Sequence, residues 1–179
     1  MRFINIHFLY RVSQKTDVYR SILEVVNVSL LGHQINIFYF QLHILTGKRT
    51  LSTLSKLESL NLSHNAISHI VDANFDGLQS LTSLALSHNR IQSVISAAFH
   101  HLSSLESLYL NNNNIKELSP RIFYKLTKLK TLDMSHNKLL LIDEDVLKDV
   151  RNLQYLRKGS IKDIFKNTTG LLKSLHEIF

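Results

Sequence analysis

Hydrophobic residues recur along the middle of the chain at the same places in four successive stretches of equal length. In residues 81–104, which read LTSLALSHNRIQSVISAAFHHLSS, leucine occupies the first, fourth and sixth positions, asparagine the ninth and phenylalanine the nineteenth. The same spacing of apolar residues and asparagine runs without insertion through residues 57–80, 105–128 and 129–152. Self-similarity at a fixed period of about 20 to 50 residues indicates a repeat architecture. The pattern therefore predicts a solenoid with four regular repeats.

Each repeat predicts one short β-strand. Leucines alternate with other residues in its central segment, so the leucines point inward and the residues between them point outward. Strands of successive repeats then pair in parallel, and the chain returns along the other side in a short helical or irregular turn. One repeat cannot bury enough apolar surface to fold alone, so stacking must supply the remaining stability. The expected fold class is an α/β solenoid.

Two regions precede the regular repeats. Residues 1–22 show no clear period, and we interpret them as an N-terminal extension. Residues 23–56 begin with LEVVNV, whose apolar residues match the first, fourth and sixth positions, but no asparagine follows at the expected place. This segment is therefore either a degenerate first repeat or unrelated sequence before the array.

The segment after the array, residues 153–179, is expected to close it. Leu153 and Leu156 begin a partial fifth repeat, but Lys158 stands where a buried leucine is expected. From Ile161 onward, apolar residues recur at helical spacing. We therefore expect a helical C-terminal cover of one or two short helices over the hydrophobic end.

One asparagine in each regular repeat lies just after the predicted strand, where the chain must turn inward. Its short side chain offers two donors and an acceptor, so it can bond the backbone of its own turn and of the next coil. This predicts a structural ladder of asparagines, which comprises Asn65, Asn89, Asn113 and Asn137.

Residues 57–152 resemble leucine-rich repeats of the 24-residue kind, LxxLxLxxNxIxxIxxxxFxxLxx. The phenylalanines Phe75, Phe99 and Phe123 resemble the class typical of extracellular receptors and adhesion proteins, including Toll-type receptors. The resemblance implies an arc with a parallel β-sheet on its concave face and the helical or irregular turns on its convex face. It also implies a non-enzymatic module that binds a protein ligand or co-receptor on the concave face.

The resemblance favours an extracellular or cell-surface location, with a glycoprotein of receptor or adhesion type as the expected setting. Extracellular members commonly flank the array with cysteine-bearing caps, and this chain contains no cysteine. The alternative is an intracellular, cytoplasmic leucine-rich repeat scaffold, which the missing cysteines favour.

The predicted partner-binding residues are those that project from the concave side of the strands. Tyr109 is the one aromatic residue among them in the regular repeats, and tyrosine is a frequent anchor of protein interfaces. The set comprises Glu58, Asn61, His64, Thr82, His88, Glu106, Tyr109, Asn112, Lys130, Asp133 and His136. A solvated face that binds nothing is the competing interpretation.

Histidines and serines on this face invite two chemical hypotheses. His64, His88 and His136 recur in one column, but Asn112 separates the first two from the third, and we interpret the histidines as part of a polar turn rather than a metal site. A hydrolytic triad with Asp133 is disfavoured, because repetition explains each residue and no nucleophile turn or phosphate loop accompanies them. We expect no catalytic residue, no cofactor and no metal.

Charge is unevenly distributed. The net charge is +7, but residues 57–152 carry nine Lys and Arg against ten acids, so the excess lies in the two flanks. Neither flank shows the alternation of aromatic and basic residues typical of a nucleic-acid surface, so nucleic acid is not an expected partner. Contact of the basic flanks with nucleic acid or anionic lipid remains a third, weaker hypothesis.

Two further features concern the secretory route. The apolar-rich stretch 22–45 contains Glu24 and several amides and histidines, so we predict no transmembrane segment in this chain. Three Asn-X-Ser/Thr triplets are candidate glycosylation acceptors, and they start at Asn27, Asn61 and Asn167.

Overall fold

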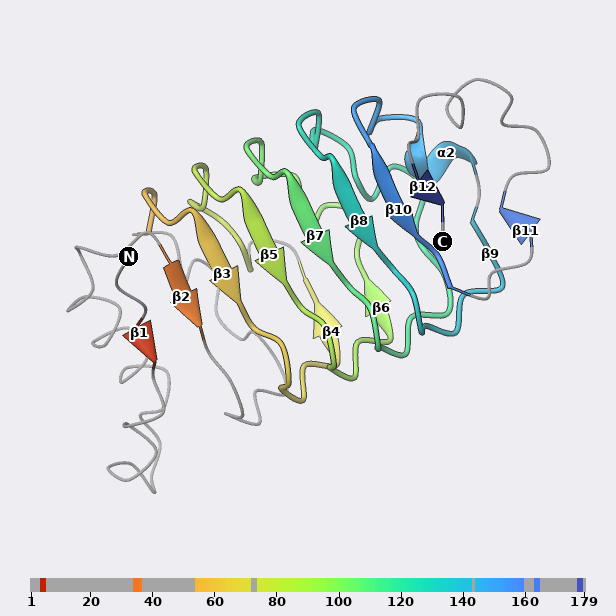
Figure 1. Cartoon of the computed structure of the whole chain (residues 1–179), viewed down its shortest axis with the longest axis horizontal. Helices are drawn as coiled ribbons and strands as arrows, with labels where there is room; N and C mark the ends of the chain where they lie inside the picture. The colour runs from red at the N-terminus through yellow and green to blue at the C-terminus, as the bar shows by residue number, and fades with distance from the viewer. Residues whose placement is uncertain are drawn as a thin grey trace.

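A computed structural model of the chain describes residues 54–71, 74–142 and 144–159, together with four short strands in the flanks. Eight parallel strands form one sheet in the order β1-β2-β3-β5-β7-β8-β10-β12, and they lie side by side in a row (Figure 1). The strands are β1 Ile4–Asn5, β2 Gln34–Asn36, β3 Ser59–Asn61, β5 Ser83–Ala85, β7 Ser107–Tyr109, β8 Thr131–Asp133, β10 Tyr155–Arg157 and β12 Glu177–Ile178. The predicted solenoid is confirmed.

The inward leucines explain why each repeat forms a strand. The central residue of each regular strand, such as Leu84 in β5 or Leu108 in β7, is fully buried. Its two neighbours are partly exposed in β3, β5 and β7, whereas in β8 one of them, Asp133, is buried. Leu60 pairs with Leu84, Leu84 with Leu108 and Leu108 with Leu132, so the leucines form a continuous row along the core. Burial of this row stabilises the stack by the hydrophobic effect.

A second row of large side chains fills the core behind the sheet. The rings of Phe75 and Phe99 lie 6.0 Å apart between centroids, and those of Phe99 and Phe123 lie 6.4 Å apart, each pair inclined by 16°. Leu147 takes the equivalent place in the fourth repeat and is also buried. Rings stacked in this way fix the spacing of the coils on the side away from the sheet.

The return side contains more strand and less helix than the sequence predicts. Two small parallel sheets pair β4 (His69–Ile70) with β6 (Ser93–Val94) and β9 (Leu141–Ile142) with β11 (Asp163–Ile164). The expectation of one strand per repeat is therefore wrong for three of the repeats. Extended segments of adjacent coils lie at strand spacing there, so their backbone groups can pair.

Helix is confined, within the described residues, to one turn in the fourth repeat, α2 (Glu144–Leu147). The other regular repeats return through hydrogen-bonded turns. The amide N–H of Leu102 donates to the carbonyl of Phe99, and that of Leu126 donates to the carbonyl of Phe123. These turns are the irregular ones that the repeat pattern allows.

The ladder asparagines bond the backbone of two coils. Asn89 Nδ2 donates to the carbonyl of Leu86 in its own coil and to that of Leu62 in the preceding coil, both at 3.0 Å. Its Oδ1 accepts from the N–H of Ile67, also in the preceding coil, at 3.0 Å. Asn113 repeats all three bonds one coil further on. These partners lie in the preceding coil, whereas the sequence pattern suggested partners in the next coil.

Two flanking strands correct the interpretation of the N-terminal region. β2 pairs with β3 so that Ile35 lies opposite Leu60, which places the preceding coil's strand at Gln34–Asn36. The sequence pattern placed that strand in LEVVNV, residues 23–28, which lie outside the described residues. β1 pairs in parallel with β2, so the presumed N-terminal extension contributes a strand to the same sheet.

The C-terminal flank differs from its prediction in the same way. β10 pairs with β8 in register, and Leu153 and Leu156 are buried, so the sheet continues into a fifth coil. Where helix was predicted, Asp163–Ile164 and Glu177–Ile178 are strands that pair with β9 and β10. An open edge of a parallel sheet carries unpaired N–H and C=O groups, and added strands satisfy them directly. The remainder of the predicted helical cover lies outside the described residues.

The ladder leads to a stability prediction. We expect Asn89→Leu to lower the free energy of unfolding by about 1 to 3 kcal/mol, because buried backbone groups of two coils lose their partner. Urea denaturation followed by circular dichroism measures the change. Asn114→Lys is the matched control, since the equivalent place in the fourth repeat is the exposed Lys138. Equal stability of Asn89→Leu and wild type would contradict the structural role.

Candidate protein-binding face

The solvent-facing side of the eight-stranded sheet is the surface that the sequence predicts as the concave face, and we keep that name. Because each regular strand pairs with its equivalent in the next repeat, equivalent side chains lie in columns across it. One column runs through the last outward residue of each strand: Asn61, Ala85, Tyr109, Asp133 and Arg157. The columns bring most of the predicted strand residues onto one surface.

The N-terminal part of this face, on β3 and β5, uses its polar groups internally. Asn61 Oδ1 accepts a hydrogen bond from the N–H of Ser63 at 2.9 Å. Thr82 Oγ1 donates to the carbonyl of Glu58 at 2.9 Å. Ala85 adds only a methyl group between them and Tyr109. Asn61 and Thr82 therefore use polar atoms within the chain, whereas Glu58, His64 and His88 of this part are exposed.

The C-terminal part, on β7, β8 and β10, carries charge. Lys130 Nζ lies 2.9 Å from Glu106 Oε2, and nearly half of each side chain is exposed. An exposed pair of this kind contributes little to stability. The ammonium group of Lys130 and the carboxylate of Glu106 therefore remain accessible on the surface as a donor and an acceptor.

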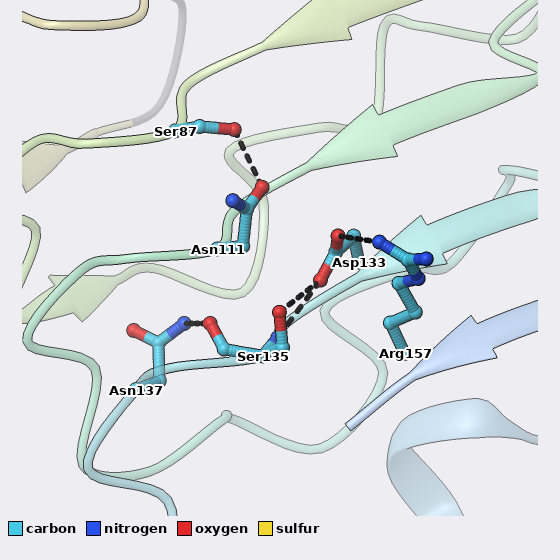
Figure 2. A network of polar contacts seen from close by, with 6 residues as sticks. All are labelled: Ser87, Asn111, Asp133, Ser135, Asn137 and Arg157. Carbon is cyan, nitrogen blue, oxygen red and sulfur yellow. Dashed lines mark hydrogen bonds and ion pairs between the residues drawn. The ribbon is translucent and has the colours of Figure 1, made fainter. Parts of the chain in front are cut away.

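Asp133 is buried and lies in a network of polar contacts (Figure 2). Its Oδ1 accepts from both the N–H and the hydroxyl of Ser135, at 3.0 and 2.7 Å. Its Oδ2 lies 4.0 Å from Arg157 Nη1, and its side chain is 11% exposed. In the same network, Ser87 Oγ donates to Asn111 Oδ1 at 2.6 Å across adjacent coils. These contacts fix the polar edge of β7 and β8.

Two tyrosines border this charged part. Tyr109 is half-buried on β7, and Tyr155 on β10 is 44% exposed. Sequence reasoning missed Tyr155 and Arg157 because it ended the regular array at residue 152. The signal was present in Leu153 and Leu156, whose spacing continues the first and fourth positions of the repeat.

The histidine column lies at the turn after each strand rather than on the strand itself. His64, His88, Asn112 and His136 all adopt left-handed backbone, with φ between 54° and 59°. Among residues other than glycine, asparagine and histidine are enriched in this conformation, so backbone geometry explains the column. The rings of His64 and His88 stack at 4.4 Å. In the described ranges, no group of three or more His, Cys, Asp or Glu side chains is arranged to hold a metal ion.

The candidate glycosylation sites are separated by the structure. Asn61 lies on β3 in the concave face, half-buried and bonded to Ser63. Asn27 and Asn167 lie outside the described residues.

The comparisons with known proteins agree with this geometry. The leucine rich repeat family matches residues 55–115, 79–139 and 103–157, which together span more than half of the chain. The chain therefore belongs to the leucine-rich repeat family. No curated protein matches the sequence.

Two solved structures show the same fold. A leucine-rich repeat protein of Leptospira interrogans is 22% identical with a TM-score of 0.69, and the match covers 81% of this chain and 36% of that one. A chain in the structure of the Toll–Spatzle complex of Drosophila is 19% identical with a TM-score of 0.72, covering 81% of this chain and 20% of that one. This chain thus spans about a third or less of the length of these relatives.

The helical content of the described residues also bears on membrane insertion. Among those residues, no helix has the length and apolar character needed to cross a bilayer.

The left-handed turns lead to a second prediction. We expect His88→Val to destabilise the chain by about 1 to 2 kcal/mol, because a β-branched side chain fits this backbone poorly. His88→Asn should remain within about 0.5 kcal/mol of wild type, since Asn112 occupies the same conformation one coil away. Urea denaturation of both variants measures the difference, with the exposed Gln92→Val as control. A similar loss of stability in both His88 variants would contradict the backbone explanation and show that the imidazole ring itself stabilises the turn.

Proposed function

We propose that this chain binds another protein through its concave face. The main support is a contrast across that face. Small hydrogen-bonded residues lie on β3 and β5, whereas two accessible tyrosines and two ion pairs lie on β7, β8 and β10. Tyrosine and arginine are enriched among the residues that dominate binding energy. A solvated face without a partner does not require such side chains to gather at one end.

We further propose that the chain is part of an extracellular or cell-surface receptor or adhesion protein. The recurring place of Phe75, Phe99 and Phe123 supports this setting through the resemblance to that class of repeats, and these rings form the stacked row of the core. The intracellular scaffold is the second candidate, because the chain has no cysteine for a disulfide-bonded cap.

Selection of binders tests the role of the face directly. Random peptides displayed on phage are panned against the purified chain, and captured peptides are assayed for affinity by fluorescence polarisation. We expect Tyr109→Ala to weaken the captured peptides about tenfold or more, which is the scale of an interface anchor. The melting temperature of Tyr109→Ala should remain close to that of wild type, because Tyr109 is only half-buried.

The matched control for this prediction is Tyr124→Ala. Tyr124 is also half-buried, but it lies on the return side, where its ring contacts His100 and Arg121. If Tyr124→Ala weakens binding and Tyr109→Ala does not, the binding surface lies away from the concave face and the proposal fails.

Expression in secreting cells tests the location. Fused behind a secretion signal, the chain should enter the medium as a glycoprotein whose mass falls on enzymatic removal of N-linked glycan. Asn167→Gln should remove more of this glycan than Asn61→Gln, because the side chain of Asn61 is bonded within the concave face. A chain that is retained and carries no glycan would support the intracellular scaffold.

A further inference from the structure

Lys130 and Arg157, two cations of the described part of the concave face, differ in how far the chain itself neutralises them. Lys130 Nζ makes a close ion pair with Glu106 at 2.9 Å. Arg157 approaches Asp133 only to 4.0 Å, a distance too long for a hydrogen bond. The side chain of Arg157 is 66% exposed and makes no hydrogen bond within the described part of the chain. Its guanidinium group therefore keeps its N–H donors open to a partner.

Ser135 orients Asp133 beside this cation. Both hydrogen bonds from Ser135 fall on Oδ1, and the side chain of Asp133 is 11% exposed, so Oδ2 is the oxygen that faces Arg157. Figure 2 shows Asp133 between Ser135 on one side and Arg157 on the other. The carboxylate lies beside the guanidinium group at a distance that leaves its N–H donors without a hydrogen bond. An arginine in this state can bind a carboxylate with two parallel hydrogen bonds.

Aromatic surface lies on two sides of this cation. Tyr155 and Arg157 are the first and last residues of β10, with Leu156 between them, so both side chains project from the same face. Tyr109 lies in the same column as Arg157, two strands away across Asp133, which corresponds to about 10 Å at the usual strand spacing. An acidic side chain bound at Arg157 would therefore have apolar contact area beside it.

The two basic side chains differ in the acids beside them. Glu106 already forms a close pair with Lys130, whereas Arg157 has only Asp133, whose Oδ1 is occupied by Ser135 and whose Oδ2 lies 4.0 Å away. Of the two, Arg157 is therefore the cation more available to a negatively charged partner. Complementary charge of this kind steers association and fixes orientation.

We propose that the β8–β10 part of the concave face is the subsite for an acidic side chain of the partner protein, with Arg157 as the residue that binds its carboxylate. A neighbouring apolar or aromatic residue of the partner packs on Tyr155, and Tyr109 borders the site across the sheet. This inference rests on the proposed function, because it names the chemistry of the partner for the same face.

The panned peptides test this subsite. We expect them to be enriched in Asp or Glu next to an apolar or aromatic residue, relative to the unselected library. Arg157→Gln should weaken them about tenfold or more, and Arg157→Lys should restore part of the loss, since lysine keeps the charge but not the planar fork. Raising NaCl from about 0.05 M to about 0.5 M should weaken wild type more than Arg157→Gln, because salt screens exposed charges.

Arg151→Gln is the matched control, because Arg151 is an exposed cation in the turn before β10 and outside the face. Circular dichroism establishes that Arg157→Gln is folded, as expected for so exposed a side chain. Peptides that are sensitive to Tyr109→Ala but insensitive to Arg157→Gln, or that are enriched in Lys and Arg, would overturn the acidic subsite and leave the proposed function standing. Peptides insensitive to both substitutions would overturn the two together.

Discussion

The whole array depends on backbone hydrogen bonds that one coil obtains from an asparagine of the coil after it. The carbonyls of Leu62 and Leu86 accept from the Nδ2 of Asn89 and Asn113. The N–H groups of Ile67 and Ile91 donate to the Oδ1 of the same two side chains. Because the same amide also bonds its own coil, it holds two adjacent coils so that residues one repeat apart lie side by side. That shift sets the columns of the concave face, so the spacing of any binding surface is fixed by buried amides.

Much of this fold is predictable because leucine and asparagine occupy fixed places in the period. The sequence prediction located strands β3, β5, β7 and β8 but not β2, for a physical reason. In β2, Ile35 lies opposite Leu60, whereas the fixed period would place Asn36 there, so the period does not reveal this strand. Counting from Ile35, the place of the asparagine is taken by Phe40. The short strands of the return side carry no comparable marker, since two extended residues leave no periodic pattern.

The candidate site is predictable to a smaller extent. Alternation along the strands indicates that Tyr109 and Asp133 project from one face, and the strand register places them opposite each other. Alternation does not indicate that Asp133 is buried and bonded to Ser135, because that state depends on how one turn closes over the strand. Nor does it reveal the backbone reason for the histidine column, since left-handed φ values are a property of the folded turn. To predict Tyr155 and Arg157 as residues of the face, the fifth coil has to be recognised from the sequence. Lys158 stands where the pattern expects leucine, and this concealed the fifth coil.

The direction of the asparagine bonds has a consequence for synthesis on the ribosome. Each coil receives its amide support from residues made later, so an emerging coil stays incomplete until about one further repeat has left the exit tunnel. We therefore expect the chain to fold with a lag of one coil behind its growing end. Position 161 carries isoleucine in place of the next asparagine. The last support of this kind is therefore the one that Asn137 gives to Leu110 and Ile115 of the third regular repeat. The parallel strand β12, added beside β10, provides backbone pairing at the end of the array.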